Sequence, residues 1–562
     1  MEMDLQDQAN DHDDEINISD CFNPDGTMKL ALYCQYMEQQ ERLDDEEDNR
    51  LMETMMDDEN EQDNSDSATR ATTSTTTTTR TRVRSCKSLK PYYFDSNGRK
   101  VELKPRQTIW YLMYVVSPTL DSAKWHKKFR RRFRMPYSEW LELLEQCQQD
   151  HRFKRWMSKD AVGLQSSPLE LMILGALRYL GRGLTFDDLE EYTAINEETH
   201  RQFLHAFIDF GAKVLYPLHV KMPTTKEEFH PHQREFAVGG MPGAGFSSDG
   251  TNVVMWRCSH NLKQANMGFK QSNPARTYNL TCNHRRLILH TTEGHPSRWN
   301  DKTLAHFDQF LNQLHEGRIL QDVGFGLFSW EGEIGKSRLE HTRYKGAWGL
   351  VDNGYHRWSC TQAPGKHDLL RSEQRLSEWM ESFRKDAECC FGILKGRWRV
   401  LKTGIRLDGP VAADKIWLTC CALHNWLLRT DGLDEWHSSM GENDVQEMRR
   451  FAPLALQRLT DEELRVFGGR EHERQSTNEE QRRRAIQRQR DTTAQDDENM
   501  DASDGSNDNL QGPQRYALDG SVLVNSLAYD DFRNRLVEHF DIMFRKNRVR
   551  WPTQRATTNN NH

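Results

Sequence analysis

The chain has 562 residues, of which 36% are hydrophobic and 29% are charged, so it is long enough for two or three domains. Residues 1–70 hold 23 acidic and 4 basic side chains, whereas the remainder is net basic by 10. The 11 cysteines form no CxxC pair, and there is no apolar leader, which excludes a disulfide-stapled secreted protein. The absence of a long apolar run excludes a membrane partner. We expect a soluble intracellular protein whose basic part binds nucleic acid, although an acidic solubilising tail would give the same charge pattern.

Residues 1–105 are acidic and then rich in threonine. Such a segment buries too little apolar surface to offset its ordering entropy, so it is predicted to be a disordered arm. Residues 106–225 are predicted to be helical and begin with a basic run at 124–134. This run fits a nuclear address, a phosphate contact or a solvated surface. Its candidate DNA contacts are Lys127, Arg130, Arg131 and Arg132.

Residues 167–216 have the pattern of three helices, with Ser167 and Pro168 marking the first start and a GRG segment its end. A short helix and a tight turn before a longer helix resemble a helix-turn-helix, although a plain helical bundle explains the pattern equally well. Arg201 on the third helix is a candidate DNA contact.

Residues 236–430 change to a period of two and predict an α/β domain with element order β-β-β-α-β-α. The first strand lies in GAGFSSDGTNVVMW, and RTYNLTCN and RLILHTTE predict an antiparallel hairpin. AWGLVDNGY predicts a short buried fourth strand, and two helices follow it. Residues 431–530 are predicted to be a charged, largely disordered linker, and 531–552 a basic amphipathic helix that docks on the core.

Three acidic residues stand out in this domain: Asp249 on the first strand, Asp352 at the end of the fourth, and Glu388 on the next helix. If the two strands are neighbours, their carboxylates converge, and a cation must neutralise them. Two Mg²⁺ or Mn²⁺ ions would then support in-line phosphoryl displacement. A surface or capping role for each residue, including an ion pair between Glu388 and Arg384, is the plainer alternative. Basic residues near Glu388 are candidate DNA contacts, namely Lys395, Arg397 and Arg399.

Five motifs in this region carry a family resemblance: SSDGTNVVM, GHPSRWNDKTL, LVDNGY, ECCFGILKGRWRVL and CCALHNWLL. Together they resemble the DDE transposases of the PIF/Harbinger type, including the related plant-transposon family. Thirty-five residues lie between Asp352 and Glu388, which suits the DD35E spacing of such enzymes.

The resemblance implies a ribonuclease-H-like mixed sheet with flanking helices, preceded by the helix-turn-helix-like domain. It implies a nuclear, divalent-metal-dependent DNA endonuclease and strand-transfer protein acting on transposon ends, a Myb-like partner protein and a homo-oligomer. It assigns Asp249, Asp352 and Glu388 as the catalytic acids and metal ligands. Asp301 matches a further acidic position, where a metal ligand and a helix N-cap are both open.

Three other functions compete with this one. A domesticated transposase-derived DNA-binding or protein-interaction factor would keep the fold without catalysis. Zinc would need the C-x-H pairs Cys258/His260 and Cys282/His284 to converge. A helical interaction module is the third possibility.

Overall fold

The computed structural model describes residues 92–94, 99–159, 163, 166–268, 273–331, 338–365, 368, 370–434, 515–549 and 551–552. The expected acidic arm therefore lies almost wholly outside the described residues, and the expected linker, 431–530, lies outside them from 435 to 514. The last part of this linker holds a short strand, Val522–Leu523, and a 3-10 turn, Val524–Ser526, where disorder was expected. Contacts divide the chain into two compact units: one runs to residue 118 and includes 186–200, and the other contains 119–185 and everything from 201 onward. This division differs from the expected one, because residues 186–200, which were expected within the helical region 106–225, belong to the first unit.

The first unit begins inside the predicted disordered arm. Strands β1 (Tyr92–Phe94) and β2 (Lys100–Glu102) pair antiparallel, so folded structure starts before residue 105. Trp110 stacks on Tyr192 with ring centroids 5.2 Å apart. The unit's remaining elements are η2 (Pro105–Gln107), α2 (Ile109–Tyr111), η3 (Leu112–Val116) and α7 (Phe186–Thr193).

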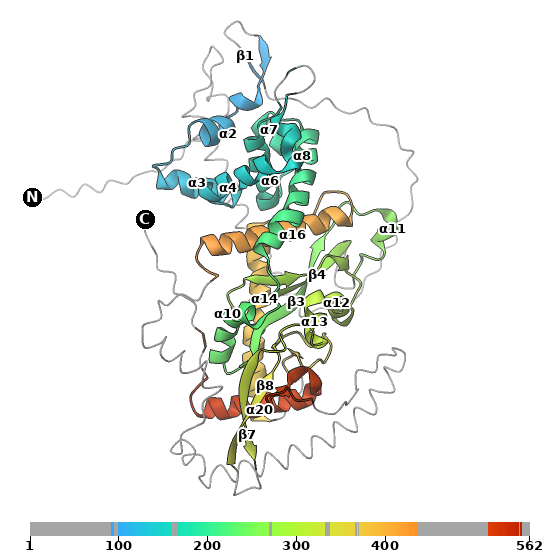
Figure 1. The fold of residues 1–562 in the computed structure, drawn as a ribbon. Coiled ribbons are helices and arrows are strands. Elements are labelled where there is room, and N and C mark those ends of the chain that lie inside the picture. The colour runs from blue at the N-terminus through green and yellow to red at the C-terminus, as the bar shows by residue number, and fades with distance from the viewer. Residues whose placement is uncertain are drawn as a thin grey trace, which may run out of the picture. The chain divides into compact units, whose positions relative to one another are not determined.

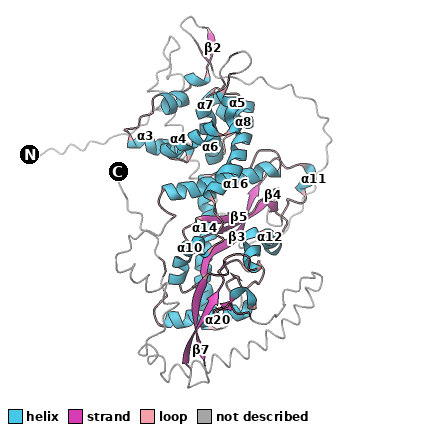
Figure 2. Cartoon of the chain, viewed as in Figure 1, coloured by secondary structure: helices cyan, strands magenta, loops and turns pink. Residues whose placement is uncertain are grey.

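Figures 1 and 2 show the helices and strands of the described residues. The helices of the second unit follow the apolar periodicity of the sequence. In α3 (Ala123–Phe133) the aromatic residues Trp125, Phe129 and Phe133 recur every fourth position and are buried. Gly183 ends α6 with φ +70°, a conformation that glycine adopts without strain. The three helices expected over 167–216 are confirmed as α6 (Leu169–Arg182), α7 and α8 (Glu197–Phe210). The others here are α4 (Tyr137–Gln149), η4 (His151–Phe153), α5 (Lys154–Met157), η5 (Gly211–Leu215), α9 (Tyr216–His219) and α10 (Lys226–Val238).

A mixed sheet with strand order β10-β9-β3-β4-β5 forms the centre of the second unit, and β6 joins it beside β4. β3 pairs antiparallel with β4 and parallel with β9, so the predicted first and fourth strands are neighbours. The predicted hairpin is confirmed as β4 and β5. The strands are β3 (Ala244–Val254), β4 (Ala275–Cys282), β5 (Ile288–Thr291), β6 (His295–Pro296), β9 (Trp348–Leu350) and β10 (Thr361–Gln362).

Residues alternate between the two faces of this sheet, as the period of two requires. Phe246 on β3 packs with Phe310, Leu311 and Leu314 of one helix layer. Ala244, two residues earlier, would share the face of Phe246 in a regular strand, but the register of β3 against β9 shifts between Ala244 and Ser247. Ala244 accordingly belongs to a different buried cluster, which contains Met380 and Phe383 of α14. The remaining helices are α11 (His260–Lys263), α12 (Asp301–Phe307), α13 (Gln309–His315), α14 (Arg371–Arg397), α15 (Val400–Thr403) and α16 (Pro410–Thr430).

Two antiparallel strands lie in the charged segment between α13 and β9. β7 (Gly324–Glu331) pairs antiparallel with β8 (Arg338–Lys345), and β11 (Val522–Leu523) adds a third strand parallel to β8. After η6 (Val524–Ser526), the terminal helix α20 (Tyr529–Arg545) packs on β7, which confirms docking of a C-terminal helix on the core.

His539 of α20 gives this docking a pH dependence. It is 2% exposed and accepts a hydrogen bond at Nδ1 from the Phe328 backbone N–H at 3.0 Å. Burial, with a smaller contribution from His341, lowers the pKa of His539 to about 3. Below pH ~6.5 His539 binds a proton in the unfolded chain but stays neutral in the folded chain. This contribution to stability is therefore lost as the pH falls from about 6.5 toward 3. We expect His539→Asn, which keeps an acceptor, to lose less stability than wild type between pH 7 and pH 5 in urea titrations. Equal losses would contradict a neutral His539.

Candidate functional site

Asp249 and Asp352 meet because β3 and β9 run parallel. Ser247 is aligned with Leu350 in this pair. Asp249 lies two residues beyond Ser247, and Asp352 lies two residues beyond Leu350, so both carboxylates stand at the same edge of the sheet. The chain turns directly after Asp352, where the Tyr355 N–H donates to the Asp352 carbonyl at 3.1 Å.

Glu388 lies on α14, which packs on β3 and carries this residue to the same edge of the sheet. Arg384, one turn earlier, links it to the strand: its Nη2 lies 2.8 Å from Glu388 Oε1, and its Nη1 lies 3.4 Å from Asp249 Oδ2. The same guanidinium also contacts Glu381 at 2.8 Å. The plainer alternative for Glu388, an ion pair with Arg384, is therefore present, and the same arginine joins Glu388 to the strand carboxylate. A ligand role for Glu388 stays a prediction.

The environment of Asp249 disfavours its ionised form. The pKa of Asp249 is raised to about 6, chiefly by burial and to a smaller extent by Asp352 and Glu388, while the Gly250 N–H and Arg384 oppose the shift. The repulsion from two other carboxylates shows that the three acids share one electrostatic site. Such a site favours a cation.

Asp301 adjoins this site from α12. A Cβ added to Gly354, two residues after Asp352, would clash with Asp301 Oδ2, and one added to Gly250 would lie 3.8 Å from Asp301 Oδ1. Asp301 is not the N-cap of its helix. The cap is Asn300, whose Oδ1 accepts from the Thr303 N–H at 2.8 Å, and Asp301 follows it in the first turn.

The capping assignment predicts different effects for two neighbouring residues. Asn300→Ala removes the cap and is expected to lower the free energy of unfolding by about 1 kcal/mol. Asp301→Asn removes only a charge in the first turn and is expected to change stability by less than that. Chemical denaturation of both variants measures the difference, and a larger loss for Asp301→Asn would contradict the assignment.

A buried polar network lies next to the carboxylates, and it was not predicted from the sequence. Asn279 on β4 donates to Asp308 at 2.7 Å and accepts from the Tyr355 hydroxyl at 2.5 Å. Asp308 also caps α13 by accepting from the Leu311 N–H at 2.9 Å. The sequence held one weak signal for this network. Asp308 lies inside a continuous apolar helical period, at the point where α12 ends and α13 begins.

Hard divalent cations prefer oxygen ligands, which is the donor set that the four acids offer. Within the described ranges, however, no three His, Cys, Asp or Glu side chains are grouped closely enough to hold a metal ion. Arg384 lies between Glu388 and Asp249 and neutralises them in this arrangement. The donor chemistry therefore fits a divalent cation, and Arg384 must give way for one to enter.

The zinc alternative loses its geometric basis. Cys282 is aligned with Ser247 at one end of the β3–β4 ladder, and Cys258 follows its other end, roughly 23 Å away at about 3.3 Å per residue. His284 is also engaged, since its Nδ1 lies 2.5 Å from Asp386 Oδ2.

The candidate DNA contacts on α3 divide into exposed and buried residues. Lys127 and Arg131 are exposed, whereas Arg132 is only 5% exposed. Arg130 is occupied by Asp431, whose two carboxylate oxygens accept from its Nη2 at 2.6 and 2.7 Å.

The other candidate DNA contacts are all partly buried. Lys395 donates to the Asn252 carbonyl at 3.1 Å, which ties the end of α14 to β3. Arg397 lies 3.9 Å from Asp431. Arg399 and Arg201 are half-buried.

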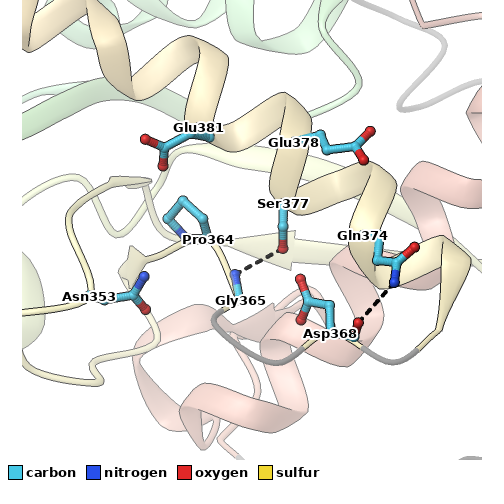
Figure 3. A pocket seen from close by; sticks show the side chains of 8 residues that line it. All are labelled: Asn353, Pro364, Gly365, Asp368, Gln374, Ser377, Glu378 and Glu381. Carbon is cyan, nitrogen blue, oxygen red and sulfur yellow. Dashed lines mark hydrogen bonds between the residues drawn. The ribbon is translucent and has the colours of Figure 1, made fainter. Parts of the chain in front are cut away.

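A pocket of about 430 Å³ lies beside Asn353, the residue after Asp352 (Figure 3). One wall is the N-terminal half of α14, and the facing wall is formed by the segment around Pro364 and Gly365. Three carboxylates line it, those of Asp368, Glu378 and Glu381. Each of these carboxylates has a basic partner: Asp368 lies 3.7 Å from Arg533, Glu378 lies 3.6 Å from Arg371, and Glu381 lies 2.8 Å from Arg384.

No helix in the described part of the chain is long and apolar enough to cross a membrane. Residues 248–425 match a family model described as DDE superfamily endonuclease. The matched region contains Asp249, Asp301, Asp352 and Glu388. No curated protein and no solved structure gave a match. The central region is therefore transposase-like at the level of this endonuclease superfamily.

Proposed function

We propose that residues 236–430 form a divalent-metal-dependent DNA endonuclease and strand-transfer domain of the PIF/Harbinger transposase type. The observation that carries this proposal is the parallel β3–β9 pairing, which brings Asp249 and Asp352 to one edge of the sheet within reach of Glu388. The endonuclease family match over 248–425 supports the same reaction class.

The arrangement of the sheet supports a ribonuclease-H-like fold for this domain. Its first three strands in chain order, β3, β4 and β5, are antiparallel neighbours. β9 and β10 then extend the other side of β3, each parallel to its neighbour.

In this proposal Asp249, Asp352 and Glu388 hold the cation, and Asp301 completes the set from α12. When bound, divalent cations stabilise charge on the phosphoryl oxygens and activate the attacking oxygen. Arg384 must leave Glu388 and Asp249, and it keeps Glu381 as a partner at 2.8 Å when it does. Tyr355 and Asn279 hold the turn after Asp352 in place through their hydrogen bond.

DNA contacts in this proposal come from the exposed basic residues, of which Lys127 on α3 is the clearest case. Affinity is expected to fall with salt by roughly −0.9 in log–log slope for each phosphate contact. Lys127→Gln should therefore reduce the slope by about 1. Arg132→Gln is the matched control, because the 5% exposed Arg132 is expected to leave the slope unchanged. Anisotropy titrations across salt concentrations provide the measurement, and equal slopes for Lys127→Gln and wild type would remove Lys127 from the interface.

A nuclear location, a Myb-like partner, transposon ends as the DNA substrate and a homo-oligomer stay predictions of this proposal. So does the helix-turn-helix-like role of residues 106–225. Within that region His200 is only 2% exposed and hydrogen bonds to Thr193 at 2.7 Å, so it is not available to DNA in this conformation.

The direct test is nicking of a supercoiled plasmid by the purified full chain, with Mg²⁺ or Mn²⁺ and with a chelator. Metal-dependent nicking supports the proposal. DNA binding with no nicking under either metal would instead favour the domesticated, non-catalytic factor.

A further inference from the structure

Three aromatic side chains stack beside the candidate site in a segment that the proposed reaction leaves without a role. His295 and Trp299 stack with ring centroids 5.1 Å apart, and Trp299 stacks on Phe307 at 4.8 Å. His295 and Phe307 close the group at 5.4 Å. We call these three residues the aromatic stack.

The outer ring of the aromatic stack is open to solvent. Phe307 is 57% exposed at the end of α12. The next aromatic residue, Phe310, is fully buried in the core cluster that also contains Leu311 and Leu314, and Phe307 is not a member of that cluster. The domain core therefore does not need the Phe307 ring, and its outward position calls for another explanation.

The aromatic stack is tied to the carboxylate site through α12. Asp301 begins this helix and Phe307 ends it, which separates them by roughly 9 Å at 1.5 Å per residue. Trp299 lies two residues before Asp301. Because Asp301 adjoins Gly250 and Gly354, the stack is one helix length from the acids of the site.

Exposed cationic residues occur in the same segment of chain as the exposed ring: Arg298 precedes Trp299, and Lys302 follows Asp301. Aromatic rings and cations in one exposed segment are the combination that binds unpaired nucleotides, since the rings stack on bases and the cations attract phosphates.

We propose that the aromatic stack receives an unpaired base of the DNA next to the bond that is cut. This inference rests on the proposed nuclease function, because it takes DNA as the ligand of the neighbouring carboxylates. A base fits better than a protein partner, since Phe307 is the exposed ring of the stack and the same segment carries the exposed cations Arg298 and Lys302. Stacking is tolerant of sequence, so the site holds the strand in position and does not read it.

The test compares single-stranded and duplex DNA binding by the full chain in EDTA, where cleavage does not take place. Phe307→Leu keeps an apolar side chain but cannot stack, and it is expected to weaken binding of a labelled oligothymidine by roughly 5- to 150-fold, the range for one stacked base. Phe307→Tyr keeps the ring and should bind within about twofold of wild type. Blunt duplex binding should be unchanged in both variants. Phe544→Leu is the matched control, an aromatic residue 42% exposed on α20.

Several results would overturn the proposal: equal losses on single strand and duplex, full binding by Phe307→Leu, or no single-strand binding by wild type. A supporting result is one in which Phe307→Tyr and Phe544→Leu behave like wild type and Phe307→Leu alone loses single-strand affinity. The binding assay contains no metal. Its result can therefore be interpreted even if the plasmid assay shows no nuclease activity.

Discussion

Asp249→Ala, Asp352→Ala and Glu388→Ala are each expected to abolish metal-dependent nicking while DNA affinity stays within about twofold of wild type. The three carboxylates would hold the cation, whereas exposed basic residues such as Lys127 would hold phosphate. Loss of a direct metal ligand should exceed the roughly 10- to 100-fold effect that follows loss of an outer hydrogen-bond partner.

Nicking rates and anisotropy titrations of the same protein preparations would separate the two effects. Glu378→Ala is a matched control, since Glu378 lies on the same helix as Glu388 and its side chain is 68% exposed. Near-normal nicking by any of the three variants would remove that residue from the site. Asp301→Asn belongs in the same series, where a sharp loss of nicking without loss of stability would support a ligand role.

Asp386→Ala is expected to lower the free energy of unfolding by about 3–5 kcal/mol, the range for breaking a buried charged pair by removing one partner. Asp386 on α14 is 3% exposed. It lies 2.5 Å from His284 Nδ1 and 3.3 Å from Arg286 Nη2, both in the turn between β4 and β5. Burial raises the pKa of Asp386, and His284 and Arg286 oppose that shift. Truncation leaves His284, itself 2% exposed, without this partner.

Urea denaturation at neutral pH measures the effect of Asp386→Ala. Asp386→Asn keeps a hydrogen-bond acceptor and should lose less stability than Asp386→Ala. The control is again Glu378→Ala, whose exposed ion pair with Arg371 at 3.6 Å should contribute no more than about 1 kcal/mol. A cost for Asp386→Ala as small as that of the control would mean that α14 is held on the sheet by its apolar residues alone.

The position of Arg384 bears on the first of these predictions. Arg384 is 11% exposed and contacts Asp249, Glu381 and Glu388. It keeps three like charges together in the absence of another cation, which is otherwise unfavourable. The same guanidinium would compete with a divalent ion for Glu388 and Asp249, so metal entry requires its side chain to turn toward Glu381.

Much of the domain followed from the sequence alone. The period of two over 244–254 and 275–291 identified β3, β4 and β5, and the apolar periodicity identified α14 and α16. Local patterns suffice here because side chains alternate across a strand and recur every three or four residues on a helix. His424 and Asn425 of the CCALHNWLL motif are both fully buried, and Asn425 hydrogen bonds to the Ile288 backbone N–H and carbonyl.

Only the tertiary structure decided which strand lies beside which. The sequence placed Asp249 and Asp352 on two strands, but their convergence depends on the parallel β3–β9 pairing across about 100 residues of chain. It likewise decided that 324–345 is a hairpin covered by α20, because such pairing depends on contacts with residues near 540. The sequence also left undetermined the cap at Asn300, the burial of Arg132 and the set of carboxylates that Arg384 contacts. A residue's type does not say which neighbours the folded chain brings to it. The sequence by itself determined the chemistry available to the site, and the long-range packing of strands and helices determined which of those groups meet.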